Sequence, residues 1–311
     1  MKRTTFTFAA GFWMLAALWF PGSILAAGGN EEPVVEEDIT FREVDDMELK
    51  LDIARPARGR RRSPALVYVF GGLGWQSGSR GQFKQEIERA AEHGYVAVAV
   101  DYRLTGGECP LTGGAGTVEG RYPFPAQLHD VKCAVRWLRE NADSYRIDPD
   151  RIGVIGWGCG GQLALMAALT DPEDGFEGPV PDDCESSRVQ AAVGLEPPTE
   201  MASFYEDLVG YTADKEVWFR GYLGGTPEEV PARYVEASPV SYVSPDDPPV
   251  ALFYGESDRT KNQGEILQER MTNAGGECDL NIIPGLRHGQ LSIPSPTWSA
   301  ALWDFLDSHL M

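Results

Sequence analysis

The stretch VIGWGCGGQLAL, residues 154–165, is typical of a strand end, a tight turn and the start of an apolar helix. On either side of it, short apolar segments alternate with segments of helical periodicity. Short continuous apolar strands separated by helices indicate a parallel sheet that is covered on both faces. The sequence therefore predicts an α/β fold whose mostly parallel sheet has about eight strands, with helices on both faces.

Around this unit the expected elements follow one another along the chain. Phe41–Val44 and Leu49–Ile53 flank Asp45-Asp46, which predicts a β-hairpin. The other predicted strand cores are Ala65–Phe70, Val96–Val100, Ile152–Ile155, Val189–Leu195, Val250–Tyr254 and Leu280–Ile283. The predicted helices are Gln82–His93, Ala126–Asn141, Gly161–Leu169, Gln263–Ala274 and Pro296–Leu310. We expect one domain over residues 39–311, with a small helical insertion around residues 197–247.

The N-terminal residues have the pattern of an export signal. Lys2 and Arg3 precede an apolar stretch from Phe6 to Phe20, and small residues end at Ala27. We expect a signal peptide over residues 1–27, with an uncleaved membrane anchor as the alternative. Residues 28–38, which are acidic and rich in Gly and Glu, are expected to form a mobile leader. In either case the domain would be exported, to the periplasm or the outside.

Charge and cysteine content narrow the possible functions. The formal net charge of −20 argues against nucleic-acid binding, which needs clustered basic residues. The five cysteines lack metal-ligand spacing, so we expect no metal and no cofactor. Cys109 and Cys184 fall in predicted loops and are the predicted disulfide pair in an oxidising compartment. The odd count leaves at least one thiol free or paired between chains.

Candidate functional residues lie where predicted strands end. In a parallel sheet, ligands meet the loops that leave the carboxyl ends of the strands. Asp258 and His288 each follow such a strand, as a carboxylate and an imidazole of a catalytic pair would. The alternative is that both are ordinary surface residues. In the loop FGGLGWQSGS, residues 70–79, consecutive glycines let backbone N–H groups approach a ligand oxygen, or they serve only as a tight connection.

Together these segments resemble the esterase/lipase branch of the α/β-hydrolases, in particular bacterial bifunctional feruloyl and acetyl-xylan esterase-like proteins. The resemblance runs from about residue 40 to the C-terminus. Its segments include VYVFGGLGWQSGSR, AVDYRL, ASPVSYVSPDDPPVALFYGESD, IPGLRHG and the long run from FPAQLHD to GCGGQLAL. The family implies a Ser–Asp–His triad that hydrolyses carboxylic esters, with Asp258 as the acid and His288 as the base. It also implies an oxyanion hole from the N–H groups of Gly71, Gly72 and Cys159.

The serine of this family's G-x-S-x-G turn falls on Gly158. Cys159, one residue later, could replace it as a thiol nucleophile, or could be a small residue packed beneath the turn. The turn requires very small residues two before and two after the nucleophile. Gly156 and Gly160 satisfy this around Gly158, whereas Trp157 lies two residues before Cys159. The oxyanion loop also departs from the family, because Leu73 is inserted within it.

These observations lead to two hypotheses. The first is an exported pseudo-esterase that keeps an acyl- or ester-shaped cleft lined by Trp75, Trp157 and His288 and binds a small acyl or ester ligand. The second is a working hydrolase that uses Cys159, or a water activated by His288 and Asp258. A structural domain with no pocket function is the third interpretation. The family label alone suggests feruloyl or acetyl-xylan specificity, and the residues themselves identify no ligand.

Overall fold

The sheet anticipated from the alternating apolar segments is present in the computed structural model, which describes residues 32–58, 61–106, 122–179, 184–210, 212, 214–291 and 296–311. The described residues belong to one compact unit, Glu31–Met311. The predicted signal peptide lies outside the described residues. Cys109 does too, and Cys184, which is described, is a free thiol, so nothing in the structure supports the predicted pair.

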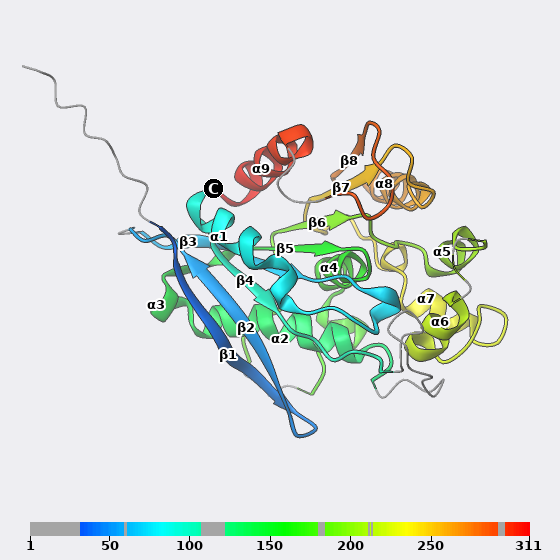
Figure 1. Ribbon diagram of the computed structural model, residues 1–311, viewed down its shortest axis with the longest axis horizontal. Helices are drawn as coiled ribbons and strands as arrows, with labels where there is room; N and C mark the ends of the chain where they lie inside the picture. The colour runs from blue at the N-terminus through cyan, green and yellow to red at the C-terminus, as the bar shows by residue number, and fades with distance from the viewer. Residues whose placement is uncertain are drawn as a thin grey trace, which may run out of the picture. The chain divides into compact units, whose positions relative to one another are not determined.

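Eight strands form one sheet in the order β1-β2-β4-β3-β5-β6-β7-β8. β1 and β2 pair antiparallel, as do β2 and β4, and the other neighbours are parallel. The bounds are β1 Val34–Val44, β2 Met47–Arg55, β3 Ser63–Val69, β4 Val96–Val100, β5 Ile147–Trp157, β6 Ala191–Leu195, β7 Val250–Gly255 and β8 Cys278–Ile283. The predicted α/β-hydrolase sheet is thus confirmed, and its parallel strands direct their carboxyl ends to one side (Figure 1).

The leader prediction is wrong for residues 34–38, because β1 begins at Val34. These residues pair with the far end of β2, where Val34 lies opposite Arg55. Their acidic side chains form ion pairs with cations that follow β3 in the sequence: Arg80 binds Asp38 and Lys84 binds Glu37. Backbone pairing and ion pairs therefore outweigh the disorder that an acidic composition favours. The predicted hairpin is confirmed, with Asp45 and Asp46 at positive φ in its turn.

Helices cover both faces of the sheet (Figure 1). α1 (Lys84–Glu92) and α9 (Pro296–Leu310) lie on one face, and α2 (Ala126–Glu140) and α4 (Cys159–Leu169) lie on the other. α3 (Ala142–Tyr145) follows α2, and α8 (Asn262–Ala274) packs on β7 and β8. The helical spacing of α2 is confirmed by Leu128, Val131 and Val135, which are fully buried. None of the described helices is long and apolar enough to cross a bilayer.

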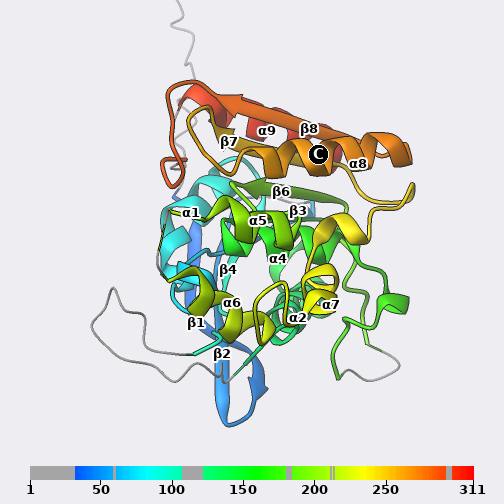
Figure 2. The ribbon, with the colours of Figure 1, turned by 90° about the vertical axis from the view of Figure 1, so that its right-hand side faces the viewer.

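The insertion contributes helices beside the ends of the strands. Its helices are α5 (Met201–Asp207), α6 (Lys215–Leu223) and α7 (Pro231–Glu236). They gather on the side to which the arrowheads of β5 and β6 point (Figures 1 and 2). Aromatic rings join them to the main domain: Trp75 stacks on Tyr222 of α6 at a centroid distance of 3.9 Å. This packing places a mostly apolar wall over the region where the candidate residues were expected.

Candidate functional site

The turn between β5 and α4 has a sharp bend at Gly158, where φ is 53° and ψ is −119°. Two close backbone approaches fix its register. A Cβ added to Gly156 would lie 2.1 Å from the carbonyl oxygen of Gly160, and one added to Gly160 would lie 2.2 Å from that of Phe70. Real Cβ atoms do not approach so closely, so only glycine fits at both positions. The apex of the turn is therefore Gly158, and Cys159 is the first residue of α4.

Gly158 itself faces open space. A Cβ built on it meets no heavy atom within 4 Å. Its backbone is held on both sides, because its N–H donates to the Leu195 carbonyl (2.8 Å) and its carbonyl accepts from Gln162 N–H (3.1 Å). The turn thus has a positive φ and room for a side chain at a residue that has none.

Asp258 and His288 come together from loops after β7 and β8. His288 Nδ1 lies 2.9 Å from Asp258 Oδ2. Asp258 Oδ1 accepts hydrogen bonds from the Thr260 N–H (2.8 Å) and hydroxyl (2.9 Å). The carboxylate is fully buried, whereas 31% of the His288 side chain is exposed. In this arrangement Nδ1 carries the proton that is donated to Asp258, and Nε2 is the ring nitrogen that is available to a ligand.

Each member of the pair shifts the pKa of the other. Burial by itself would raise the pKa of Asp258, but the hydrogen bond and charge of His288, with the Thr260 donors, lower it. Burial would lower the pKa of His288, but the hydrogen bond to Asp258 and the charges of Asp258 and Glu196 raise it. The two shifts favour an ionised aspartate beside a protonated imidazole.

The glycine-rich loop passes close to the turn. A Cβ on Gly71 would lie 2.0 Å from the Trp157 carbonyl oxygen, and one on Gly72 would lie 1.8 Å from that of Ser77. After the inserted Leu73, whose N–H is bound by the Ser77 hydroxyl (3.2 Å), the loop continues at positive φ. Both Gly71 and Gly72 line the same cavity as Gly158.

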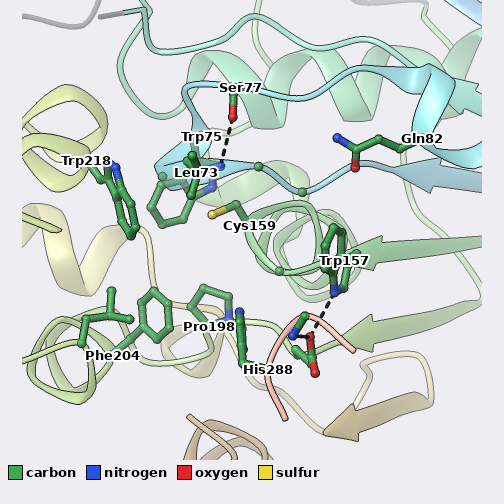
Figure 3. A pocket seen from close by; sticks show the side chains of 17 residues that line it. Leu73, Trp75, Ser77, Gln82, Trp157, Cys159, Pro198, Phe204, Trp218 and His288 are labelled. Carbon is green, nitrogen blue, oxygen red and sulfur yellow. Dashed lines mark hydrogen bonds between the residues drawn. The ribbon is translucent and has the colours of Figure 1, made fainter. Parts of the chain in front are cut away.

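Cys159 directs its sulfur toward this loop, on the side of Leu73 and Trp75 (Figure 3). Burial raises the pKa of its thiol to about 12, although backbone N–H groups of Trp75, Gly74 and Gly72 hydrogen-bond to the sulfur and act in the opposite direction. At neutral pH the thiol is therefore protonated, and a thiol is a far weaker nucleophile than a thiolate. The sulfur lies against the backbone of the glycine-rich loop.

Both tryptophans that were predicted to line the cleft do line the cavity, and they differ in exposure. Trp75 is only 1% exposed and forms the floor, with its indole N–H donating to Gln162 Oε1 (3.2 Å). Trp157 is half-buried, and its indole N–H donates to Glu196 Oε2 (3.1 Å). The cavity has a volume of about 370 Å³. Its remaining large apolar side chains are Leu73, Pro198, Phe204, Leu208 and Trp218.

Sequence reasoning missed Glu196. This residue follows β6 directly, so the rule that singled out Asp258 and His288 would also have found it. It is fully buried, and Oε2 accepts hydrogen bonds from Trp157 and from the Gly289 N–H (2.7 Å). One donor atom each of Glu196, Asp258 and His288 lies within 4.8 Å of the others, so among the described residues these three could contact a bound cation.

The fold and the site together define an α/β-hydrolase of the esterase branch. An eight-stranded sheet carries a sharp turn after β5, a glycine-rich loop after β3 and an acid–histidine pair after β7 and β8. The chain belongs to the BD-FAE family, a family of carboxylic ester hydrolases whose model matches residues 51–271. The stated resemblance is thereby confirmed.

Individual relatives are esterases. Esterase LipQ of Mycobacterium tuberculosis is 31% identical over 64% of this chain and 42% of its own length. Esterase LipC of the same organism is 27% identical over 79% of this chain and 58% of its own length. The chain thus spans about half the length of these curated relatives. The thermophilic esterase Est2 of Thermogutta terrifontis, with propionate bound, superimposes with a TM-score of 0.69 at 26% identity, over 91% of this chain and 97% of Est2.

Proposed function

We propose that this protein is a pseudo-esterase that binds a small acyl or ester compound without cleaving it. The carrying observation is Gly158: the turn keeps the positive φ of a nucleophile position, with open space above it, but offers no oxygen or sulfur. Asp258 and His288 keep the arrangement of an acid and a base. Without a nucleophile between them and the ligand, this pair holds a ligand oxygen and forms no acyl intermediate.

The shape and lining of the cavity support a ligand with an apolar body and a carbonyl group. Phe204, Leu208 and Trp218 supply the apolar wall, and His288 supplies the polar contact. The Est2 structure carries propionate, so this relative binds a compound with a short acyl chain. A carbonyl over Gly158 would place its oxygen near the N–H groups of the glycine-rich loop, with Gly71, Gly72 and the backbone of Cys159 as the proposed donors.

Two observations weigh against a working hydrolase that uses Cys159. The apex of the turn is Gly158, and a nucleophile in such a turn stands at the apex. Cys159 comes one residue later and is therefore not in position to attack. Burial also raises the pKa of the thiol to about 12, which keeps it protonated at neutral pH.

The test is to restore the serine with Gly158→Ser. Loss of a triad serine typically lowers kcat on the order of 10⁶-fold. We therefore expect the parent to leave p-nitrophenyl acetate essentially unhydrolysed, and Gly158→Ser to raise the rate by at least about 10³-fold. Gly158→Ala is the matched control, because it adds a Cβ at the same φ without an oxygen.

Two further results complete this test. In the Gly158→Ser background, His288→Ala should abolish the gain, since the serine then has no base. Parent protein that hydrolyses the ester at an ordinary enzymatic rate, about 1 per second or more, and loses this activity in His288→Ala, would contradict the proposal.

We also propose that the domain is exported, on the pattern of residues 1–27. Cell fractionation with a tagged full-length chain tests this. Recovery of the full-length protein in the cytoplasmic fraction would overturn it.

A further inference from the structure

Glu196 is held in an unusual backbone conformation at the centre of the site. Its φ is 54°, a region that residues with a Cβ rarely occupy. Such a conformation persists where the surroundings over-determine it, and functional sites are enriched in it. Here Oε2 binds the Trp157 indole next to the turn and the Gly289 N–H next to the histidine. Glu196 therefore connects the two halves of the site.

The other oxygen of this carboxylate has no hydrogen-bond partner. Glu196 Oε1 is buried, in a side chain with no exposed surface. Burial raises the pKa of Glu196, against the charge of His288 and the hydrogen bonds from Gly289 and Trp157. A buried carboxylate oxygen without a hydrogen bond is costly, and a nearby positive charge is what offsets that cost. The nearby group that can carry such a charge is the His288 imidazole, within the 4.8 Å cluster.

We propose that Glu196 is a second carboxylate partner of His288, which makes the imidazole a hydrogen-bond donor and makes the cleft select an uncharged carbonyl ligand, an ester or amide, over a carboxylate. This inference rests on the proposed function, because it concerns the ligand held in the same cleft. Glu196 acts through the imidazole and is a positioning residue.

The charges around the imidazole determine this selection. Asp258 approaches from the loop after β7 and Glu196 from the end of β6, so two carboxyl groups face one imidazole. Cys159 of α4 is a further titratable group that lines the cavity, and its thiol stays neutral because burial raises its pKa to about 12. The cluster thus brings two carboxyl groups to one imidazole, and a ligand carboxylate would add a third acidic group that the other two repel. An uncharged carbonyl accepts the same hydrogen bond from His288 without this repulsion.

The binding test uses hexanamide and hexanoate, which have the same shape and differ in charge. With the full chain at neutral pH, we expect calorimetry to show hexanamide binding at least about tenfold more tightly than hexanoate. Glu196→Gln should reduce this ratio by about tenfold or more, because it removes one of the two carboxyl groups that would repel a ligand carboxylate. Glu196→Asp, which keeps the charge, should retain discrimination and serves if the glutamine variant folds poorly.

A second readout follows the imidazole directly. In NMR titrations of the His288 ring, the pKa should fall in Glu196→Gln, since one of its two carboxylate partners is lost. The matched control is Glu256→Gln. Glu256 accepts a hydrogen bond from the Gly285 N–H (3.0 Å) in the loop that carries His288, but its side chain is exposed. This control should leave both the ligand preference and the His288 titration unchanged.

The inference is overturned if hexanoate binds the parent as tightly as hexanamide. It is also overturned if Glu196→Gln folds but changes neither the ratio of the hexanamide and hexanoate affinities nor the pKa of His288. Failure of the proposed function would instead be seen as ester turnover by the parent, so the two failures are distinguishable.

Discussion

Gly158 has the positive φ of the proposed nucleophile position and lacks the Cβ that would be strained there. At φ 53° a residue with a Cβ is strained by about 1–3 kcal/mol, and glycine is not. Once catalysis is not required, glycine stabilises the turn and leaves the surrounding site in place. The same residue therefore explains both the proposed loss of activity and the preserved geometry.

The stability of Gly158 variants should reflect this strain. We expect Gly158→Ser and Gly158→Ala to lower the free energy of unfolding by about 1–3 kcal/mol each, since no atom within 4 Å obstructs the new Cβ and only the backbone is strained. Urea denaturation measures the change. A cost well above this range would mean that the space above Gly158 is closed.

Cys159 should limit the activity that a restored serine can recover. Its sulfur points towards the glycine-rich loop, which supplies donors of the proposed oxyanion hole. Losing one oxyanion donor costs about 10²–10³-fold in kcat, so Gly158→Ser/Cys159→Ala should exceed Gly158→Ser by at least about tenfold. Steady-state kinetics decide this, with Cys159→Ala alone as the inactive control. Equal rates for the single and double variants would show that the sulfur does not obstruct the hole.

Thiol labelling tests the state of Cys159 without any variant. A thiol whose pKa is raised to about 12 by burial should resist iodoacetamide at neutral pH and react only after unfolding. Peptide mapping of native and urea-treated samples measures this. Stoichiometric labelling of Cys159 in the folded protein would revive the thiol mechanism.

At the scale of elements, α2 is joined to its surroundings by buried charges as well as by its apolar face. Lys132 is fully buried and donates to Glu177 (2.6 Å) and to the Thr170 carbonyl (3.2 Å). Arg136 binds the other oxygen of Glu177 at 2.6 Å. A single carboxylate from the loop after α4 thus neutralises two cations of α2.

Removing this carboxylate should be costly. We expect Glu177→Gln to lower the free energy of unfolding by about 3 kcal/mol, at the low end for a broken buried pair, because 20% of the Glu177 side chain is exposed. Glu173→Gln, an exposed change in the adjacent 3₁₀ segment (Pro172–Asp174), should stay within about 0.5 kcal/mol. Similar effects of the two variants in urea denaturation would contradict the role of the buried pair.

The Asp258–His288 pair joins the loops after β7 and β8, and its contribution to stability should depend on pH. The lowered pKa of Asp258 gives stability that is lost as pH falls through its folded-state pKa. The raised pKa of His288 gives stability that is present below the unfolded value, about 6.5, and is lost as pH rises through the folded-state pKa.

The pair should therefore contribute most between about pH 4 and about pH 6.5. The difference in unfolding free energy between the parent and Asp258→Asn should be largest in this window and should fall on both sides. A difference that does not change with pH would mean that the pair is not coupled in this way.

The whole molecule carries a large negative charge, with a formal net value of −20 and a sequence pI of about 4.6. Like charges repel one another in the compact state, and salt screens this repulsion. Raising NaCl from about 10 mM to about 0.5 M shortens the Debye length from about 30 Å to well under 10 Å, so the Tm at neutral pH should rise. The rise should disappear near the pI. An equal salt effect at both pH values would attribute it to something other than net charge.

Much of the fold follows from local patterns. Continuous apolar runs such as Val96–Val100 indicate buried parallel strands, and the spacing of Leu128, Val131 and Val135 indicates a helix on the sheet. The prediction of a mobile leader is wrong for residues 34–38 because an acidic composition indicates disorder only for a segment that has no partners in the fold. Their order depends on pairing with β2 and on the cations of Arg80 and Lys84, which are distant in sequence.

The sequence by itself determined the α/β alternation, the glycine spacing that identifies Gly158 as the apex, and the two loops that carry Asp258 and His288. These are properties of segments a few residues long, and local sterics and periodicity govern them. Only the tertiary structure decided that Glu196 faces the imidazole and that the Cys159 sulfur lies among the loop N–H groups. Both depend on how separate strand ends converge, and burial and electrostatics act over distances in space that the order of residues does not record.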